Sequence, residues 1–159
     1  MLITVGAIGR LKDGPERELC DRYLSRASAA GRALGLTFAL RELAESRAAS
    51  APARKEQEAA ALIGGLAAGT ALVALDEGGK SLDSRAFADR IARWRDDGAG
   101  GLAFAIGGPD GHGRALLDKA TLRLAFGAMT WPHQLARIML LEQLYRTVTI
   151  LSGHPYHRD

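Results

Sequence analysis

The chain has 159 residues, 47% of them hydrophobic and 25% charged, so it is long enough for one sizeable core and short for two domains. No run approaches the roughly 18 apolar residues of a membrane span, and the N-terminal residues lack the features of an export signal. The single cysteine, Cys20, excludes an internal disulfide and a cysteine-based zinc site. We therefore expect one domain over residues 1–159, a cytoplasmic location and no membrane partner.

The formal net charge is +3, and the positive excess lies in the C-terminal third of the chain. Residues 1–110 are balanced, whereas residues 111–159 hold six basic and three acidic side chains. A surface that faces a polyanion would show this distribution, although an ordinary solvated face is the alternative. The same third also contains all four histidines: His112, His133, His154 and His157.

In chain order, short apolar runs alternate with segments of helical periodicity. A helix capped by Ser84 is expected to carry Phe87, Ile91 and Trp94 on one face. The small, polar stretch 44–54, interrupted by Pro52, is expected to be a loop. Strands are predicted at 2–8, 37–43, 70–75, 101–106 and 121–126, and further helices at 15–34, 55–68, 114–120 and 134–151.

This alternation predicts an α/β fold with a mainly parallel sheet and helices on both faces. Such sheets bind ligands at the carboxyl ends of their strands, where three loops follow strands: 75–80, 106–113 and 126–133. Glycines in the second loop allow a ligand to approach the backbone closely, although tight turns are the alternative explanation for them. Three loops at equivalent positions favour a shared ligand pocket.

Several other site types are disfavoured by the residue patterns. Arg114 stands where a Walker phosphate loop needs lysine, and no G-x-G-x-x-G is completed. His154 and His157 are separated by a proline and lack the acidic partners of a zinc site, so no metal is expected. There is no G-x-S-x-G nucleophile motif, and Cys20 has no histidine nearby in the sequence.

Four segments, "LDEGGK", "IGGPDG", "MTWPHQLARIMLLEQLYRTVTI" and "GHPYH", resemble those of the bacterial large-subunit rRNA pseudouridine N3-methyltransferases, a family of the SPOUT superfamily. The resemblance runs from Met1 to Asp159. It implies that the C-terminal part threads a deep trefoil knot, an exception to the general absence of knots. It also implies a homodimer that binds S-adenosyl-L-methionine in the knot and methylates a pseudouridine of large-subunit ribosomal RNA within the assembled ribosome.

The resemblance also implies which residues bind the cofactor. Gly127 stands where a small polar residue is expected, so only a backbone contact is implied at this position. The loop backbone would hydrogen-bond the adenine edge and the ribose, and apolar side chains would cover the ring. The implied cofactor-binding residues are Leu75, Gly108, Gly127, Ala128, Met129, Thr130, Trp131 and Pro132.

Methyl transfer from a sulfonium to the imide nitrogen N3 of pseudouridine requires orientation of the nucleophile and removal or stabilisation of its proton. His157 titrates near neutrality in its unperturbed state and is the candidate base. Tyr156 would stack on the target base or hydrogen-bond to it. Arg158 or Arg137 would stabilise the imide charge or bind phosphate.

Two alternatives stay open at this stage. A non-catalytic RNA- or ribosome-binding module with the same fold would have no use for three cofactor loops. A SPOUT enzyme acting on transfer RNA or on another ribosomal RNA base is the second, and the residues alone do not identify the base. The predicted helix 134–151 is apolar on nearly all sides, which favours a dimer interface, with a fully internal helix as the alternative.

Overall fold

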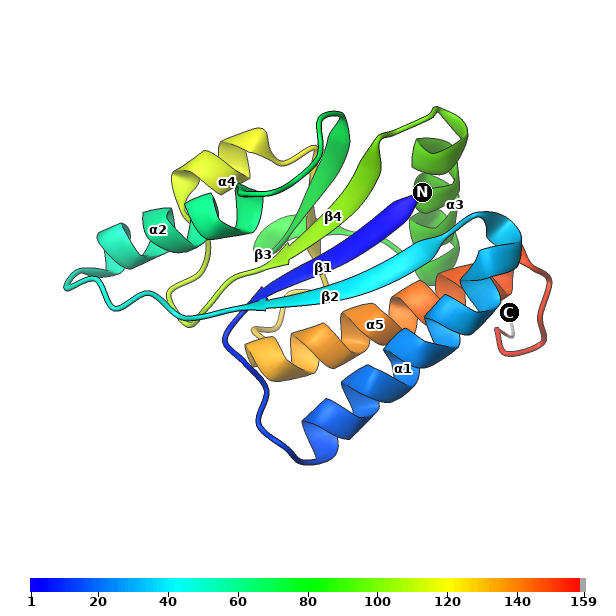
Figure 1. The fold of residues 1–159 in the computed structure, drawn as a ribbon, viewed down its shortest axis with the longest axis horizontal. Helices are drawn as coiled ribbons and strands as arrows, with labels where there is room; N and C mark the ends of the chain where they lie inside the picture. The colour runs from blue at the N-terminus through cyan, green and yellow to red at the C-terminus, as the bar shows by residue number, and fades with distance from the viewer. Residues whose placement is uncertain (158–159) are drawn as a thin grey trace.

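The computed structural model describes residues 1–157 (Figure 1). Five strands form one sheet in the order β2-β1-β4-β3-β5, and every neighbouring pair is parallel. The predicted parallel α/β architecture is therefore confirmed. The strands are β1 (Leu2–Ile8), β2 (Thr37–Leu43), β3 (Thr70–Ser81), β4 (Gly101–Ile106) and β5 (Leu122–Ala125).

Helices cover both faces of the sheet, and Figure 1 shows α2 and α4 on one side with α1, α3 and α5 on the other. The central strand β4 is buried along its whole length because it is covered on both faces. The helices are α1 (Pro15–Gly31), followed by a short 3-10 turn (Arg32–Leu34), then α2 (Ala51–Ile63), α3 (Ser84–Asp96), α4 (Arg114–Lys119) and α5 (His133–Leu151).

Strand β3 corrects the prediction that residues 75–80 form a loop. The strand continues to Ser81, and its pairing with β5 shifts register between Leu75 and Lys80. Gly79 makes this bulge possible, since a Cβ there would lie 2.6 Å from the backbone carbon of Arg123 on β5. The first of the three predicted ligand loops, residues 75–80, is therefore part of β3, which continues beside β5 after the register shift.

Two helix starts also differ from the sequence prediction. Helix α2 begins at Ala51, inside the predicted loop, with Pro52 in its first turn and Ser50 accepting a hydrogen bond from Ala53 N. Proline fits the first turn because no intrahelical N–H bond is needed there. Helix α3 is capped by the Asp83 carboxylate, which accepts from Ala86 N at 2.7 Å, and not by the predicted Ser84.

Helix α5 packs between α1 and α3 against the sheet. The buried residues along it include Leu140, Leu141, Leu144 and Val148, a spacing that forms one stripe toward the core. Leu135 keeps 42% of its surface exposed, so one side of the helix near its start is uncovered within the chain. The trefoil knot stays a prediction of the family resemblance.

None of the helices within residues 1–157 combines the length and the apolar character required to cross a membrane.

Candidate active site

A cavity of about 910 Å³ opens at the carboxyl edge of the sheet; we call it the main cavity. Its walls come from the ends of β3, β4 and β5 and from the segment that leads into α5. Lys55 on α2 and Ala136 on α5 close two of its sides. The remaining wall residues lie in the segments 75–77, 106–112, 124–127 and 129–133, together with Leu117.

The structure brings together almost all of the residues predicted to bind a cofactor. Leu75, Gly108, Gly127 and the residues 129–132 all line the main cavity, whereas Ala128 is exposed and does not. Met129 and Trp131 form part of the rim, and they remain 72% and 40% exposed. The Trp131 indole donates to the Phe126 carbonyl at 3.2 Å, which holds this segment in a compact turn.

Helix α2 holds the glycine-rich segment that follows β4. Arg54 forms an ion pair with Asp110 at 2.6 Å, and this contact lowers the pKa of the Asp110 carboxyl. The pair binds the segment to α2 beside the cavity. A Cβ on Gly108 would come within 3.0 Å of both Glu58 Oε2 and Ile8 Cγ2, so only glycine fits this junction without movement.

His112 is a wall residue whose role the sequence did not indicate. Its Nε2 lies 2.9 Å from the Leu75 carbonyl oxygen, which can only accept, so this nitrogen carries the hydrogen. Burial lowers the pKa of His112, and the contact with Leu75 opposes that shift. His112 thus holds β3 at Leu75, the last residue before the register shift and one of the residues predicted to bind the cofactor.

Arg137 is buried near the start of α5 and does not line the main cavity. Its side chain is fully buried and bonds Glu42 Oε1 at 2.5 Å and the Gly9 carbonyl at 2.9 Å. Burial lowers the pKa of the guanidinium, and the charge of Glu42 counteracts this. In this structure Arg137 ties α5 to the ends of β1 and β2, and the catalytic role predicted for it stays a prediction.

The C-terminal segment, residues 152–157, folds back onto α5. The Tyr156 hydroxyl donates to Glu142 Oε1 at 3.0 Å, and its ring lies 4.7 Å from that of Tyr145. Arg146 lies 4.9 Å above the Tyr156 ring, and its Nη1 is 3.4 Å from His157 Nδ1.

A guanidinium only donates, so the His157 lone pair that a base would need faces Arg146 here. Arg158, predicted to bind phosphate or the imide, lies outside the described residues.

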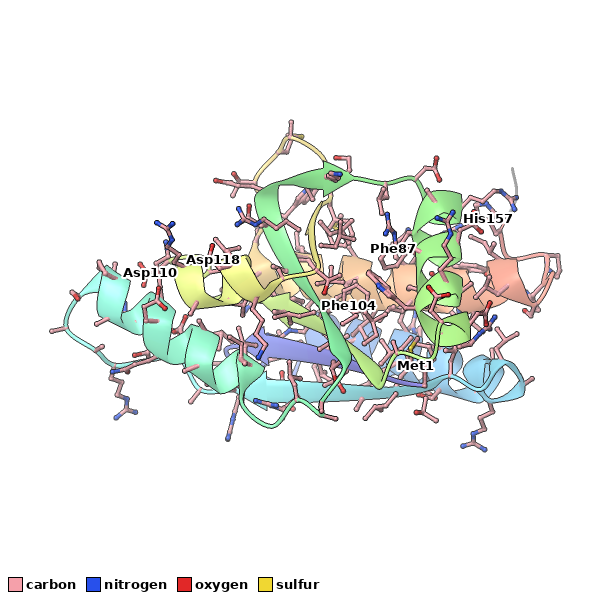
Figure 2. The ribbon with its side chains drawn as sticks, turned by 90° about the horizontal axis from the view of Figure 1, so that it is seen from above. Met1, Phe87, Phe104, Asp110, Asp118 and His157 are labelled. Atoms are coloured by element: carbon pink, nitrogen blue, oxygen red, sulfur yellow. The ribbon has the colours of Figure 1, made fainter. Side chains whose placement is uncertain are left out.

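The C-terminal segment folds back from the end of α5 to its middle, whereas the main cavity lies at the start of this helix. His133 and Ala136 at the start of this helix line the cavity, whereas the segment follows its last residue, Leu151. Glu142, which accepts from the Tyr156 hydroxyl, lies six residues beyond the wall residue Ala136, a rise of ~9 Å at 1.5 Å per residue. Figure 2 shows Asp110, another residue of the cavity wall, and His157 at opposite ends of the molecule. In this structure neither Tyr156 nor His157 lines the main cavity.

Comparison with known proteins assigns the chain to a family. The family model described as "Predicted SPOUT methyltransferase" matches residues 1–157. The chain belongs to the SPOUT methyltransferase family. Curated relatives named "Ribosomal RNA large subunit methyltransferase H" include proteins from Brucella anthropi at 58% identity, covering 100% of both chains, and from Mesorhizobium japonicum at 57%, covering 99% of both. A third, from Nitrobacter hamburgensis, is 56% identical over 99% of both chains.

A solved structure, the SpoU methyltransferase AviRb from Streptomyces viridochromogenes in complex with the cofactor AdoMet, matches 96% of this chain and 61% of its own with a TM-score of 0.39 and 13% identity. That likeness is too low to bear on the fold or on ligands.

The charges around the main cavity of this SPOUT methyltransferase are mostly negative. Asp76, Glu77 and Asp110 line it, and Lys55 is the one lysine or arginine among the wall residues that the structure describes. Since Asp110 is neutralised by Arg54, Asp76 and Glu77 remain to attract a positively charged ligand. Residues 1–157 contain no group of three or more His, Cys, Asp and Glu side chains placed to hold a metal ion.

Proposed function

We propose that this protein transfers a methyl group from S-adenosyl-L-methionine to N3 of a pseudouridine in large-subunit ribosomal RNA, within the assembled ribosome. The observation that carries the proposal is the main cavity, which gathers the predicted cofactor-binding residues at the carboxyl edge of a SPOUT methyltransferase sheet. The names of relatives at 56–58% identity supply the RNA class. A protein that acts on ribosomes works in the cytoplasm.

The main cavity fits the proposed cofactor in size and in charge. Its volume of about 910 Å³ lies within the usual range for small-molecule sites. Asp76 and Glu77 favour a ligand that carries a sulfonium and an ammonium group. Residues 127–132 offer backbone groups for the adenine edge, and Met129 and Trp131 offer apolar surface for the ring. When bound, the cofactor supplies the electrophilic methyl group.

A homodimer is part of this proposal because Tyr156 and His157 do not line the main cavity of their own chain. Near the cavity, Met129, Trp131 and Leu135 expose apolar surface that a partner would cover. A second cleft of about 560 Å³ lies beside α5, between Phe87 on α3 and Met139. An antiparallel approach of two α5 helices would bring the C-terminal segment of one protomer to the main cavity of the other.

In that arrangement Tyr156 and His157 of one protomer act on the target base held over the other protomer's cavity. Tyr156 stacks on the base or hydrogen-bonds to it. His157 accepts the N3 proton after its nitrogen leaves Arg146, and Arg158 stabilises the imide charge or binds phosphate. Methyl transfer would then depend mainly on alignment of N3 with the methyl carbon that is attached to the sulfonium.

The experiment that tests the proposal uses ribosomes from a strain in which the gene has been deleted. Purified protein and S-adenosyl-L-methionine are added, and the modified nucleotide is mapped by mass spectrometry. The proposal expects one added methyl group on N3 of one large-subunit pseudouridine, with intact ribosomes preferred over free RNA. A methyl group on transfer RNA or on another base would contradict the substrate. Ribosome binding without any transfer would indicate a non-catalytic module.

A further inference from the structure

A second, polar cavity of about 390 Å³ lies beside the main cavity, and neither the family assignment nor the cofactor accounts for it. It lies where β1 and β2 end, between the connection that leads into α1 and the start of α5. His133 lines both cavities, so they are neighbours across one side chain. Arg10, Lys12 and Arg137 provide its positive groups.

Two helices begin at this polar cavity, and neither N-terminus is capped by a side chain. Helix α1 begins at Pro15 after Gly14, and α5 begins at His133 after Pro132. The first N–H groups of a helix have no partner within the helix, and the helix dipole adds partial positive charge there. Two such termini at one cavity favour an anionic ligand.

The cations of the polar cavity have unused hydrogen-bonding capacity. Arg10 and Lys12 are exposed, and neither forms an ion pair or a side-chain hydrogen bond within residues 1–157. Arg137 is fully buried, and its Nε has no partner although both of its terminal nitrogens are bonded. A buried donor without an acceptor is costly, and an anion in the cavity would supply one.

Three carboxylates also line the polar cavity, equal in number to its three cations. Asp13 and Glu16 lie at the start of α1, where the helix dipole itself favours negative side chains. Glu45 lies on the side of Gly9 and His133, since a Cβ on Gly9 would be 3.2 Å from its Oε1 and 3.9 Å from His133 Nε2. None of these carboxylates forms an ion pair with Arg10 or Lys12 within residues 1–157, so the two exposed cations are left for an external anion.

We infer that the polar cavity binds a phosphate group of the RNA backbone beside the target nucleotide. The inference rests on the proposed function, because the adjoining main cavity holds the methyl donor. A phosphate bound by Arg10, Lys12 and the two helix N-termini would place the attached nucleotide next to His133, at the boundary between the two cavities. Its base would then face the cofactor. The polar cavity thus sets the register of the RNA strand, while the target base itself is contacted at the main cavity.

The test is a double variant, R10A/K12A, compared with R32A/R93A, which removes the same charge from exposed positions on the 3-10 turn after α1 and on α3. Methylation of ribosomes from the deletion strain is measured as KM and kcat, and cofactor affinity by calorimetry. For R10A/K12A we expect KM for ribosomes to rise on the order of tenfold, with kcat and cofactor affinity within about twofold of wild type. The salt dependence of log KM should flatten by about one, as for one lost phosphate contact. The control should change KM by less than about twofold.

Two results would overturn the inference and assign the cavity differently. A loss of cofactor affinity in R10A/K12A would mean that the cavity holds the carboxylate of S-adenosyl-L-methionine. Unchanged KM, with inorganic phosphate binding that the double variant abolishes, would indicate a site for a small free anion. Ribosome affinity is also measured by sedimentation without cofactor. Weaker binding of the double variant alone would support the phosphate contact even if the wild-type protein transferred no methyl group, whereas equal binding would refute it.

Discussion

Tyr156 donates its phenolic hydrogen to Glu142 Oε1 at 3.0 Å, and this bond holds the C-terminal segment against α5. The same carboxylate accepts from Arg146, whose guanidinium also lies over the Tyr156 ring. Glu142 therefore organises both the hydroxyl and the cation that surround this tyrosine. If the segment acts on the target base of a partner protomer, Glu142 is the residue that holds it in a defined position.

The first prediction follows from this contact. Glu142→Ala should lower kcat for ribosome methylation by roughly tenfold or more, because a group that orients a reacting residue is lost. Cofactor affinity should stay within about twofold, since Glu142 does not line the main cavity. Glu18→Ala, an exposed acidic position on α1, is the control and should behave as wild type. Equal kcat in both variants would show that docking of Tyr156 does not matter for turnover.

The second prediction concerns pH. Burial and then the bond to Glu142 raise the pKa of Tyr156 from 10.0 to about 12. Because the folded pKa lies above the unfolded one, the stabilising contribution is complete below pH 10 and is lost as the pH rises toward 12. The difference in unfolding free energy between wild type and Tyr156→Phe should be constant from pH 7 to pH 9.5 and should shrink above pH 10. Denaturant titrations across this range measure it, and a difference that grows above pH 10 would contradict the assignment.

The sequence predicted the sheet and most of the main cavity because both depend on patterns that are local in the chain. Alternating apolar runs and glycine-containing segments at strand ends identify a parallel sheet and its ligand edge. The course of β3 was missed because the DEGGK stretch is polar and glycine-rich, as loops are. Only the close approach of Arg123 on β5 shows why Gly79 is required within a strand.

The buried ion pair of Arg137 was missed for a different physical reason. The sequence does not show whether an arginine in a predicted helix will pair with a buried carboxylate. The partner of Arg137, Glu42, is distant in the sequence. The position of Tyr156, which packs on the middle of α5 and does not line the main cavity, was equally hard to predict, because it depends on how the segment after the helix folds back. Long-range placement of charged side chains is therefore what the sequence could not provide.

The third prediction measures the structural role of Arg137. Arg137→Met should lower the free energy of unfolding by about 3 kcal/mol, because it removes the buried partner of Glu42 and leaves the Gly9 carbonyl without its donor. Arg17 also pairs with Glu42, but its side chain is 25% exposed, so Arg17→Met should cost about 1 kcal/mol or less. Chemical denaturation of both variants gives the comparison. Similar losses would mean that burial does not distinguish the two pairs.

The fourth prediction tests the main cavity as the cofactor site. Ala136→Trp places a large side chain on the cavity wall from a helix position that tolerates it, so cofactor affinity should fall by roughly a hundredfold or more. Ala60→Trp on the exposed side of α2 is the matched control. Calorimetry gives the affinities, and circular dichroism confirms that both variants fold. A folded Ala136→Trp protein with normal affinity would exclude this cavity.

The last prediction tests whether the active site is shared between two protomers. A mixed dimer would combine one Ala136→Trp chain, which lacks a usable cavity, with one Y156A/H157A chain, which lacks the catalytic side chains of the segment. Each variant alone should be almost inactive. If the C-terminal segment serves the partner's cavity, the mixed dimer has one complete site, formed by the intact cavity of the second chain and the intact segment of the first. Random exchange of subunits should then restore roughly a quarter of wild-type activity, since half of the dimers are mixed and each has one of two sites.

If the segment served its own cavity, the outcome of mixing would be different. Both sites of the mixed dimer would each lack one part, and activity would stay at the level of the separate variants. In the described arrangement neither Tyr156 nor His157 lines the main cavity of its own chain, which favours the first outcome. Subunit exchange must be shown in the same sample, for example by native mass spectrometry of chains that differ in isotope content. Recovery of activity with confirmed exchange would establish that Tyr156 and His157 act across the dimer.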